Sequence, residues 1–266
     1  MIFLSGIERR APAEPADEFP WSLAVLRELQ TLHFAAPVTF LVGENGSGKS
    51  TLLEGLATGM GAVAAGSRAI EHDDSLHGVH EFARAFRFVR RRAPRVKLFL
   101  RAEDVFGFTQ RVGREMAELR ELEQDFRGRL PEGSYGQRLA TGSVAAQRRA
   151  LAARYGEQPL ARSHGETFLG ILQARLAPNG LYFLDEPETP LSPARVLSLL
   201  ALLKDRVQRD CQFIIATHSP LLLALPGAEI LLLEDGRIQP TAYDELEHVR
   251  LTRDFLANPE RFLRHL

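Results

Sequence analysis

The sequence predicts an α/β protein whose central sheet is mostly parallel. A G-x-x-x-x-G-K-S stretch at residues 43–50 stands between an apolar run and an amphipathic one. From Leu181 onward, strand-like apolar runs alternate with helix-like ones, as expected for a sheet covered on both faces. The pair Asp185-Glu186 follows one of these runs directly. This places both carboxylates at the edge where open α/β sheets bind ligands.

The glycine-rich stretch is interpreted as a phosphate-binding loop. The apolar run before it ends a buried strand, and the residues after it open a helix whose first amides point into the loop. Glycines let the backbone approach an anion, so that successive N–H groups wrap a triphosphate. The residues assigned to this contact are Gly43, Glu44, Asn45, Gly46, Ser47, Gly48, Lys49, Ser50 and Thr51. An ordinary glycine-rich turn is the alternative, and the agreement of spacing with both flanks argues against it.

Two side chains of this loop have predicted roles of their own. Lys49 reaches the β- and γ-phosphates and is counted as catalytic, whereas Ser50 offers its hydroxyl to Mg²⁺. Upstream, Phe19 and Trp21 are candidates to stack on adenine. An aromatic side chain at such a position is more often part of the core.

Length and composition allow one large domain with a helical insertion. We expect the core in residues 1–104 and 177–266, and a helical lobe in residues 105–176. The formal net charge of -1 gives no global attraction to nucleic acid or to a membrane, so any such binding is local. The single cysteine, Cys211, excludes an internal disulfide framework and suits a reducing compartment. A cytoplasmic location without direct membrane insertion is therefore expected.

The predicted lobe contains two amphipathic segments. Apolar residues recur at helical spacing over residues 111–127, residues 130–143 interrupt the pattern with glycines and a proline, and a helix resumes over residues 144–155. Ser163-His164-Gly165-Glu166 then precedes another helix. A small turn at a helix N-terminus is typical of an anion site, but any capping box resembles it.

A basic block interleaved with phenylalanines spans residues 84–101, and Arg90-Arg91-Arg92 is its densest point. Such a pattern is typical of a groove that follows a nucleic-acid backbone. The alternative is a surface strand pair whose arginines are solvated or matched to carboxylates. The near-neutral chain favours that alternative.

Acidic and imidazole groups follow two of the predicted strands. Asp185 suits the role of holding hydrated Mg²⁺, and Glu186 the role of orienting and deprotonating the attacking water. His218 follows the next strand and is expected to donate a hydrogen bond to the γ-phosphate. A helix-capping pair and an ordinary loop histidine are the alternatives. The order of loop, carboxylates and histidine along the chain favours the catalytic interpretation.

The order of residues 43–50, residues 163–166, Asp185-Glu186 and His218 resembles that of the ABC-type ATPases, with Walker A, signature, Walker B and switch histidine. The stretches D-E-P-E-T-P-L-S-P and A-T-H-S-P look like the soluble branch related to SMC, RecF and OLD ATPases. The chain is particularly similar to a bacterial group of small stand-alone predicted ATPases. The resemblance implies a P-loop NTPase fold with an antiparallel β edge, and Mg²⁺-dependent hydrolysis of ATP.

The resemblance also implies a homodimer that pairs head to tail with ATP at its interface. Ser163 and Gly165 of one subunit would bind the γ-phosphate held by the other, and Glu186 would act only in the closed dimer. We also expect an unknown protein partner, and nucleic acid is a further candidate. The expected process is DNA maintenance or defence.

The chain departs from the family pattern in more than one place. The signature lacks a leading Leu-Ser-Gly-Gly and has Glu166 where a glutamine is common, and the usual Q-loop glutamine is not evident. Arg101, Ala102 and Glu103 stand there, and Glu103 is a candidate substitute. Two alternative functions stay open. One is the ATP-binding subunit of an ABC transporter that docks on a separate membrane protein, which the missing glutamine opposes. The other is a non-hydrolysing ATP switch, which Glu186 opposes.

Overall fold

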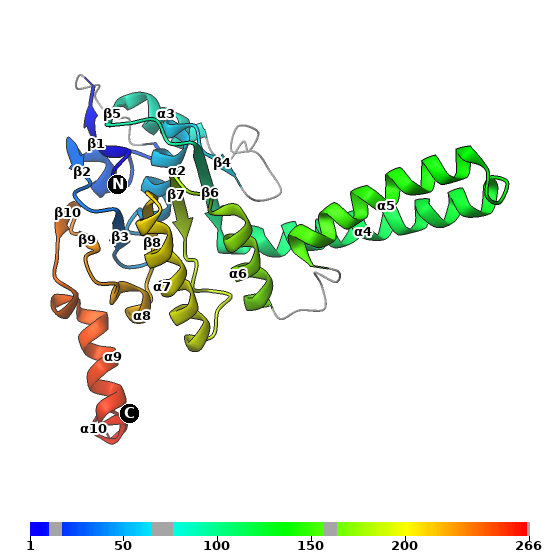
Figure 1. The fold of residues 1–266 in the computed structure, drawn as a ribbon. Helices are drawn as coiled ribbons and strands as arrows, with labels where there is room; N and C mark the ends of the chain where they lie inside the picture. Colours follow the sequence, from blue (N-terminus) through cyan, green and yellow to red (C-terminus); the bar gives the residue numbers. More distant parts are fainter. Residues whose placement is uncertain (11–17, 65–76, 157–163, 265–266) are drawn as a thin grey trace. The chain divides into compact units, whose positions relative to one another are not determined.

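The computed structural model describes residues 1–10, 18–64, 77–156 and 164–264. These residues form two compact units, one of Met1–Ala102 with Ala177–Leu266 and one of Glu103–Leu176. The first unit holds two sheets and the second is helical (Figure 1). The predicted α/β fold, with a mostly parallel sheet, an antiparallel β edge and a helical lobe, is confirmed.

The central sheet has seven strands in the order β10-β9-β3-β8-β7-β6-β4. Its strands are β3 (Val38–Val42), β4 (Val63–Ala64), β6 (Val96–Arg101), β7 (Gly180–Asp185), β8 (Gln212–Ala216), β9 (Glu229–Glu234) and β10 (Arg237–Pro240). Neighbours from β9 to β4 pair in parallel, and β9 and β10 form an antiparallel hairpin. Every residue of β3 and β8 is buried, as expected for parallel strands covered on both faces.

A second, antiparallel sheet has the order β2-β1-β5, with β1 (Leu4–Arg9), β2 (Thr31–His33) and β5 (Phe86–Arg90). Gln212 of β8 joins it to the central sheet. Its Oε1 accepts hydrogen bonds from Phe3 N at 2.7 Å and Leu4 N at 2.9 Å, and its Nε2 donates to Leu4 O at 2.8 Å. Because Gln212 is fully buried, these bonds fix the start of β1 against the central sheet.

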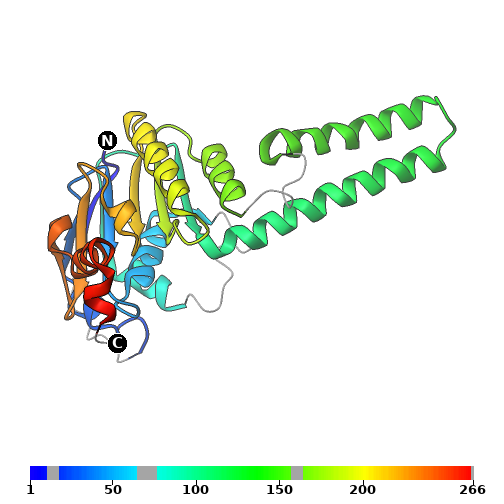
Figure 2. The ribbon, with the colours of Figure 1, turned by 90° about the horizontal axis from the view of Figure 1, so that it is seen from below.

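Helices cover both faces of the central sheet. The helices of this unit are α1 (Ala24–Arg27), α2 (Lys49–Met60), α3 (His77–Ala85), α7 (Pro193–Gln208), α8 (Pro220–Leu223), α9 (Glu247–Ala257) and α10 (Pro259–Leu263), with the 3₁₀ helix η3 (Tyr243–Glu245). The connections through α2 and α7 run in opposite directions along the sheet. Right-handed crossovers therefore place α2 and α7 on opposite faces (Figure 2).

The second unit contains α4 (Ala102–Arg129), α5 (Tyr135–Tyr155) and α6 (His164–Arg175). Helices α4 and α5 lie side by side and antiparallel (Figures 1 and 2), around a small core of Val112, Met116 and Ala152. The expected break over residues 130–143 is too long, because α5 begins at Tyr135. Ser134 caps α5 by accepting a hydrogen bond from Gln137 N. The glycines inside α5 lower its helix propensity without ending it.

No helix within the described ranges is both long enough and apolar enough to cross a bilayer.

Candidate active site

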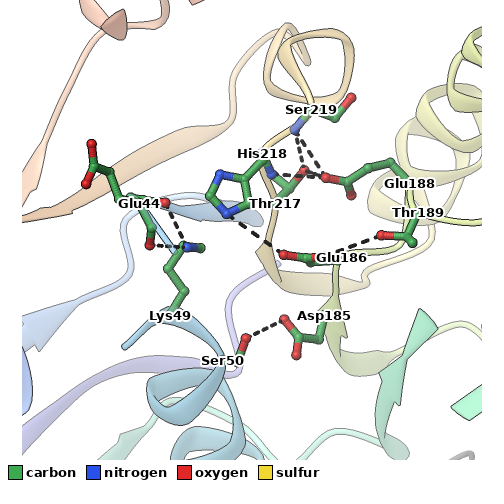
Figure 3. Close-up of polar contacts among 11 residues, drawn as sticks. Glu44, Lys49, Ser50, Asp185, Glu186, Glu188, Thr189, Thr217, His218 and Ser219 are labelled. Carbon is green, nitrogen blue, oxygen red and sulfur yellow. Dashed lines mark hydrogen bonds and ion pairs between the residues drawn. The ribbon is translucent and has the colours of Figure 1, made fainter. Parts of the chain in front are cut away.

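Three neighbouring parallel strands bring the predicted site residues to one edge of the central sheet. The phosphate-binding loop follows β3, His218 follows β8, and Asp185-Glu186 ends β7. In the sheet β8 lies between β3 and β7, so all three carboxyl ends meet (Figure 3). This is the edge at which open α/β sheets bind their ligands.

The loop between β3 and α2 has the backbone of a phosphate cradle. Gly46 and Gly48 have φ angles of 83° and 94°, in the left-handed region that favours glycine. A Cβ atom on Gly48 would lie 3.0 Å from Val25 Cγ1, a tight contact that a small shift of Val25 would have to relieve. Lys49 begins α2, and the N-terminus of this helix therefore faces the loop.

The Lys49 ammonium lies within its own loop. Its Nζ donates hydrogen bonds to Gly43 O at 2.7 Å and to Glu44 O at 2.8 Å, and the residue is only 5% exposed. Burial lowers the pKa of Lys49, and the negative charges of Glu186 and Asp185 oppose that shift. A cation held at this place suits the charge of the terminal phosphates of a nucleotide.

Ser50 and Asp185 meet across the site, where Ser50 Oγ donates a hydrogen bond to Asp185 Oδ1 at 3.1 Å. Burial raises the pKa of Asp185 to about 6, although the Ser50 hydrogen bond lowers it. A hydroxyl and one carboxylate are ligands that Mg²⁺ takes beside substrate phosphates and retained water. The two residues therefore fit the metal predicted for them.

Glu186 has an unusual backbone, with a φ angle of 44°. A non-glycine residue in this region stores strain of about 1 kcal/mol or more, and such strain gathers at functional sites. The N–H of Glu186 donates to Ala216 O at 2.9 Å, which fixes the turn against β8. Its carboxylate is 45% exposed and accepts a weak hydrogen bond from Thr189 Oγ1 at 3.4 Å. The turn thus presents a carboxylate to solvent at the edge of the sheet.

His218 lies beside that carboxylate, with 3.8 Å between its Nε2 and Glu186 Oε1. Burial lowers the pKa of His218, and the charge of Lys49 lowers it further. The imidazole is therefore neutral at neutral pH, with one nitrogen that donates and one that accepts. Its Nε2 has no hydrogen-bond partner among the described residues.

Arg101 occupies the place of the missing glutamine and forms an ion pair with Glu54 of α2. Both side chains are largely buried, and Arg101 pairs with Asp185 in the register of β6 and β7. The side chain of Glu103 lies outside what the structure describes. The sequence analysis gave Glu54 no role, although Glu54 follows Ser50 by four residues and so shares its helix face.

Two further residues near the site were missed. His248 of α9 lines an open pocket of about 890 Å³ together with residues 43–47. Burial lowers its pKa, and its Nε2 has no hydrogen-bond partner in the described part of the chain. Glu188 was noted only as part of a motif, yet it contacts the loop that carries His218. The sequence signal that could have indicated Glu188 is its place as a second glutamate directly after Asp-Glu-Pro.

The signature-like residues are described only in part. Ser163 lies outside the described residues, and Gly165 lies in the first turn of α6 in the second unit. Their roles at a γ-phosphate stay predictions.

Trp21 belongs to the core of the first unit. It is 9% exposed, its ring stacks on Phe82 at a centroid distance of 6.2 Å, and the Arg9 guanidinium lies 4.7 Å from its centroid. With its ring packed in this way, the core alternative holds for Trp21. Phe19 is 48% exposed and stays a candidate for adenine.

The basic block is divided between two sheets, since β5 belongs to the antiparallel sheet and β6 to the central one. Several of its arginines already have partners. Arg87 pairs with Glu8 at 2.5 Å, Arg101 pairs with Glu54, and Arg90 donates to Gly59 O at 3.0 Å. The block is therefore no strand pair, and its use for nucleic acid stays a prediction.

Two segments of the sequence match models of known protein families. Residues 22–127 match a model described as "AAA domain", and residues 167–224 match one described as "AAA domain, putative AbiEii toxin, Type IV TA system". Each segment is thus similar to an AAA domain. They include the phosphate-binding loop in the first case and Asp185, Glu186 and His218 in the second.

Solved structures with a similar fold include two with transporter titles. One, "An inward-facing conformation of a putative metal-chelate type ABC transporter", is 18% identical with a TM-score of 0.48, covering 96% of this chain and 90% of that one. The other is cbiO1 from Clostridium perfringens, part of the ABC transporter complex cbiONQ. It is 16% identical with a TM-score of 0.45, and all of both chains is covered. No curated protein matches the sequence.

Proposed function

We propose that this protein is a Mg²⁺-dependent ATPase. The observation that carries the proposal is the meeting of Lys49, Ser50, Asp185, Glu186 and His218 at the carboxyl ends of three adjacent strands. A buried cation beside a glycine cradle suits the triphosphate, and an exposed carboxylate next to a neutral imidazole suits hydrolysis. The AAA-domain matches in both halves of the site support the same activity.

In this mechanism each side chain has one task. The amides of residues 43–48 and the Lys49 ammonium neutralise the β- and γ-phosphates. Glu186 accepts a proton from water as the water oxygen attacks the γ-phosphorus and the bond to the ADP oxygen breaks. His218 donates a hydrogen bond to the γ-phosphate and stabilises its charge. Ser50 and Asp185 would hold Mg²⁺, which when bound neutralises charge on the phosphate oxygens.

Two copies of the chain form the complete catalyst in this proposal. Ser163 and Gly165 of one subunit cover the γ-phosphate held by the other, in a head-to-tail dimer with two nucleotides. ATP-driven closure then acts on a protein partner in DNA maintenance or defence. The support is the order of the motifs along the chain, which resembles that of the SMC, RecF and OLD branch.

Phosphate release by the purified protein tests the proposed activity. We expect turnover with ATP and Mg²⁺, and none after Mg²⁺ is removed with a chelator. Lys49→Ala is expected to abolish ATP binding, because a buried cation is lost from the cradle.

The matched control is Lys204→Ala, since Lys204 lies on α7 and is exposed. This variant should turn over like the wild type. A wild-type protein that binds ATP with Mg²⁺ but releases no phosphate would contradict the proposal.

A further inference from the structure

Glu188 connects the two loops that carry the catalytic candidates. It lies in the loop after β7, two residues beyond Glu186, and its carboxylate reaches the loop after β8 (Figure 3). Glu188 Oε1 accepts hydrogen bonds from Thr217 Oγ1, from His218 N at 3.0 Å and from Ser219 N at 3.1 Å. One oxygen atom therefore accepts hydrogen bonds from the two backbone amides that flank the Cα atom of His218.

The Glu188 carboxylate is largely shielded from solvent, and this makes its hydrogen bonds stronger. Burial raises the pKa of Glu188, and the hydrogen bonds from Thr217 and His218 oppose the shift. Hydrogen bonds to a shielded carboxylate are stronger than bonds between neutral groups, and loss of the acceptor leaves both amides without this partner. The loop that carries His218 is thus held at its backbone, while the His218 Nε2 has no hydrogen-bond partner within the described ranges.

The Glu188 hydrogen bonds affect where His218 lies relative to Glu186, the proposed base. Glu186 and His218 are 3.8 Å apart, and they line a shallow hollow together with Glu188 and Ser219. The 3.4 Å hydrogen bond from Thr189 to Glu186 and this imidazole contact do little to fix the pair. The backbone hydrogen bond from Glu186 N to Ala216 O at 2.9 Å holds the Glu186 turn against the end of β8. The Glu188 hydrogen bonds hold the loop that carries His218.

We propose that Glu188 is a positioning residue for ATP hydrolysis, which holds His218 at its distance from Glu186. This inference rests on the proposed ATPase function. It predicts that loss of the acceptor slows the chemical step and leaves ATP binding at the loop after β3 intact, because the Glu188 hydrogen bonds in the described part of the chain go to residues 217–219 and not to residues 43–50.

Steady-state kinetics of Glu188→Ala and Glu188→Gln test the inference. We expect Glu188→Ala to lower kcat by at least about tenfold, with a change in KM for ATP below about threefold, because a misplaced group costs turnover. Glu188→Gln keeps an acceptor oxygen and should retain kcat within about threefold of the wild type.

Glu229→Ala is the matched control. Glu229 Oε2 likewise accepts from a backbone amide, Ala35 N at 3.0 Å, and from a threonine hydroxyl, Thr39 Oγ1 at 3.1 Å. It stands at the start of β9, at the opposite edge of the sheet. This variant should lose stability and keep kcat within about twofold of the wild type. An equal loss of kcat in Glu229→Ala and Glu188→Ala would overturn the inference.

Three further results would overturn it: an unchanged kcat in Glu188→Ala, a loss confined to KM, or a Glu188→Gln variant as slow as Glu188→Ala. If Glu188→Ala does not fold, Thr217→Val removes the hydroxyl that donates to Glu188 and accepts from Ser219 N, and an unchanged kcat there overturns the inference instead. A wild type without turnover would overturn the proposed function and this inference together. If the wild type does turn over ATP, a negative result for the Glu188 variants overturns only the inference about Glu188 and leaves the proposed function standing.

Discussion

At the scale of single residues, the site concentrates charge at a partly buried edge of a sheet. Lys49, Asp185 and Glu188 all have pKa values shifted toward their neutral forms, and burial is the largest cause for each. Burial makes the charged form of each group less favourable, and neighbouring hydrogen bonds or opposite charges offset part of that cost. Shifts of this kind cluster at functional sites, where the charged form is completed by a ligand.

The stability of the protein should depend on pH through Glu188. A carboxyl whose pKa is raised by folding is favoured in its protonated form, so its ionisation weakens the fold as the pH rises above the ordinary range. The negative charge of Glu186 adds to the shift, and the hydrogen bonds of Thr217 and His218 oppose it. Glu188→Gln lacks the titrating group. We expect the wild type to lose stability relative to this variant between pH 4 and pH 7.

Denaturant unfolding of both proteins at the two pH values measures this difference. A wild type that gains stability relative to Glu188→Gln as the pH rises would show that the pKa of Glu188 is lowered by folding instead.

The site residues differed in how well the sequence indicated them. The loop, Asp185-Glu186 and His218 each follow a strongly apolar strand, so their common edge followed from the parallel sheet alone. Glu188 and His248 could not be placed in this way. Their contacts depend on how a loop turns and where a terminal helix packs, and neither leaves a periodic signal.

At the scale of elements, one buried side chain makes hydrogen bonds across the junction between the two sheets. Gln212 is fully buried and binds the backbone of Phe3 and Leu4 through both of its amide atoms. Gln212→Ala leaves two N–H groups and a carbonyl without partners. We expect a loss of about 3 kcal/mol in the free energy of unfolding.

Urea unfolding measures that loss, with Gln239→Ala as the control. Gln239 is exposed on β10, and its removal should change stability by less than about 0.5 kcal/mol. Equal effects of the two substitutions would contradict the role given to Gln212.

Element boundaries were predictable where apolar periodicity was strong and less so elsewhere. Strands β7 and β8 follow continuous apolar runs, and both are present. In contrast, α5 includes Gly136 and Gly142, which the sequence analysis placed in a break. Neither glycine has an atom within 4 Å of an added Cβ, so both are tolerated on an open helix face.

At the scale of the whole molecule, the proposed catalyst is a pair of chains. Glu186→Gln keeps the cradle and the metal ligands and removes the base, so bound ATP should persist. In the head-to-tail proposal, trapped ATP holds two subunits together. We expect Glu186→Gln to sediment as a dimer with ATP and Mg²⁺, and a monomer under these conditions would count against the head-to-tail arrangement.

Phosphate release by Glu186→Gln tests the central claim most directly, because one oxygen is replaced at the proposed base while size and shape are kept. ATP binding, measured on the same samples, should match the wild type. Release should fall by at least about 100-fold, within the range that a general base contributes. Release at the wild-type rate by a variant that binds ATP would contradict the assignment of Glu186 as the base.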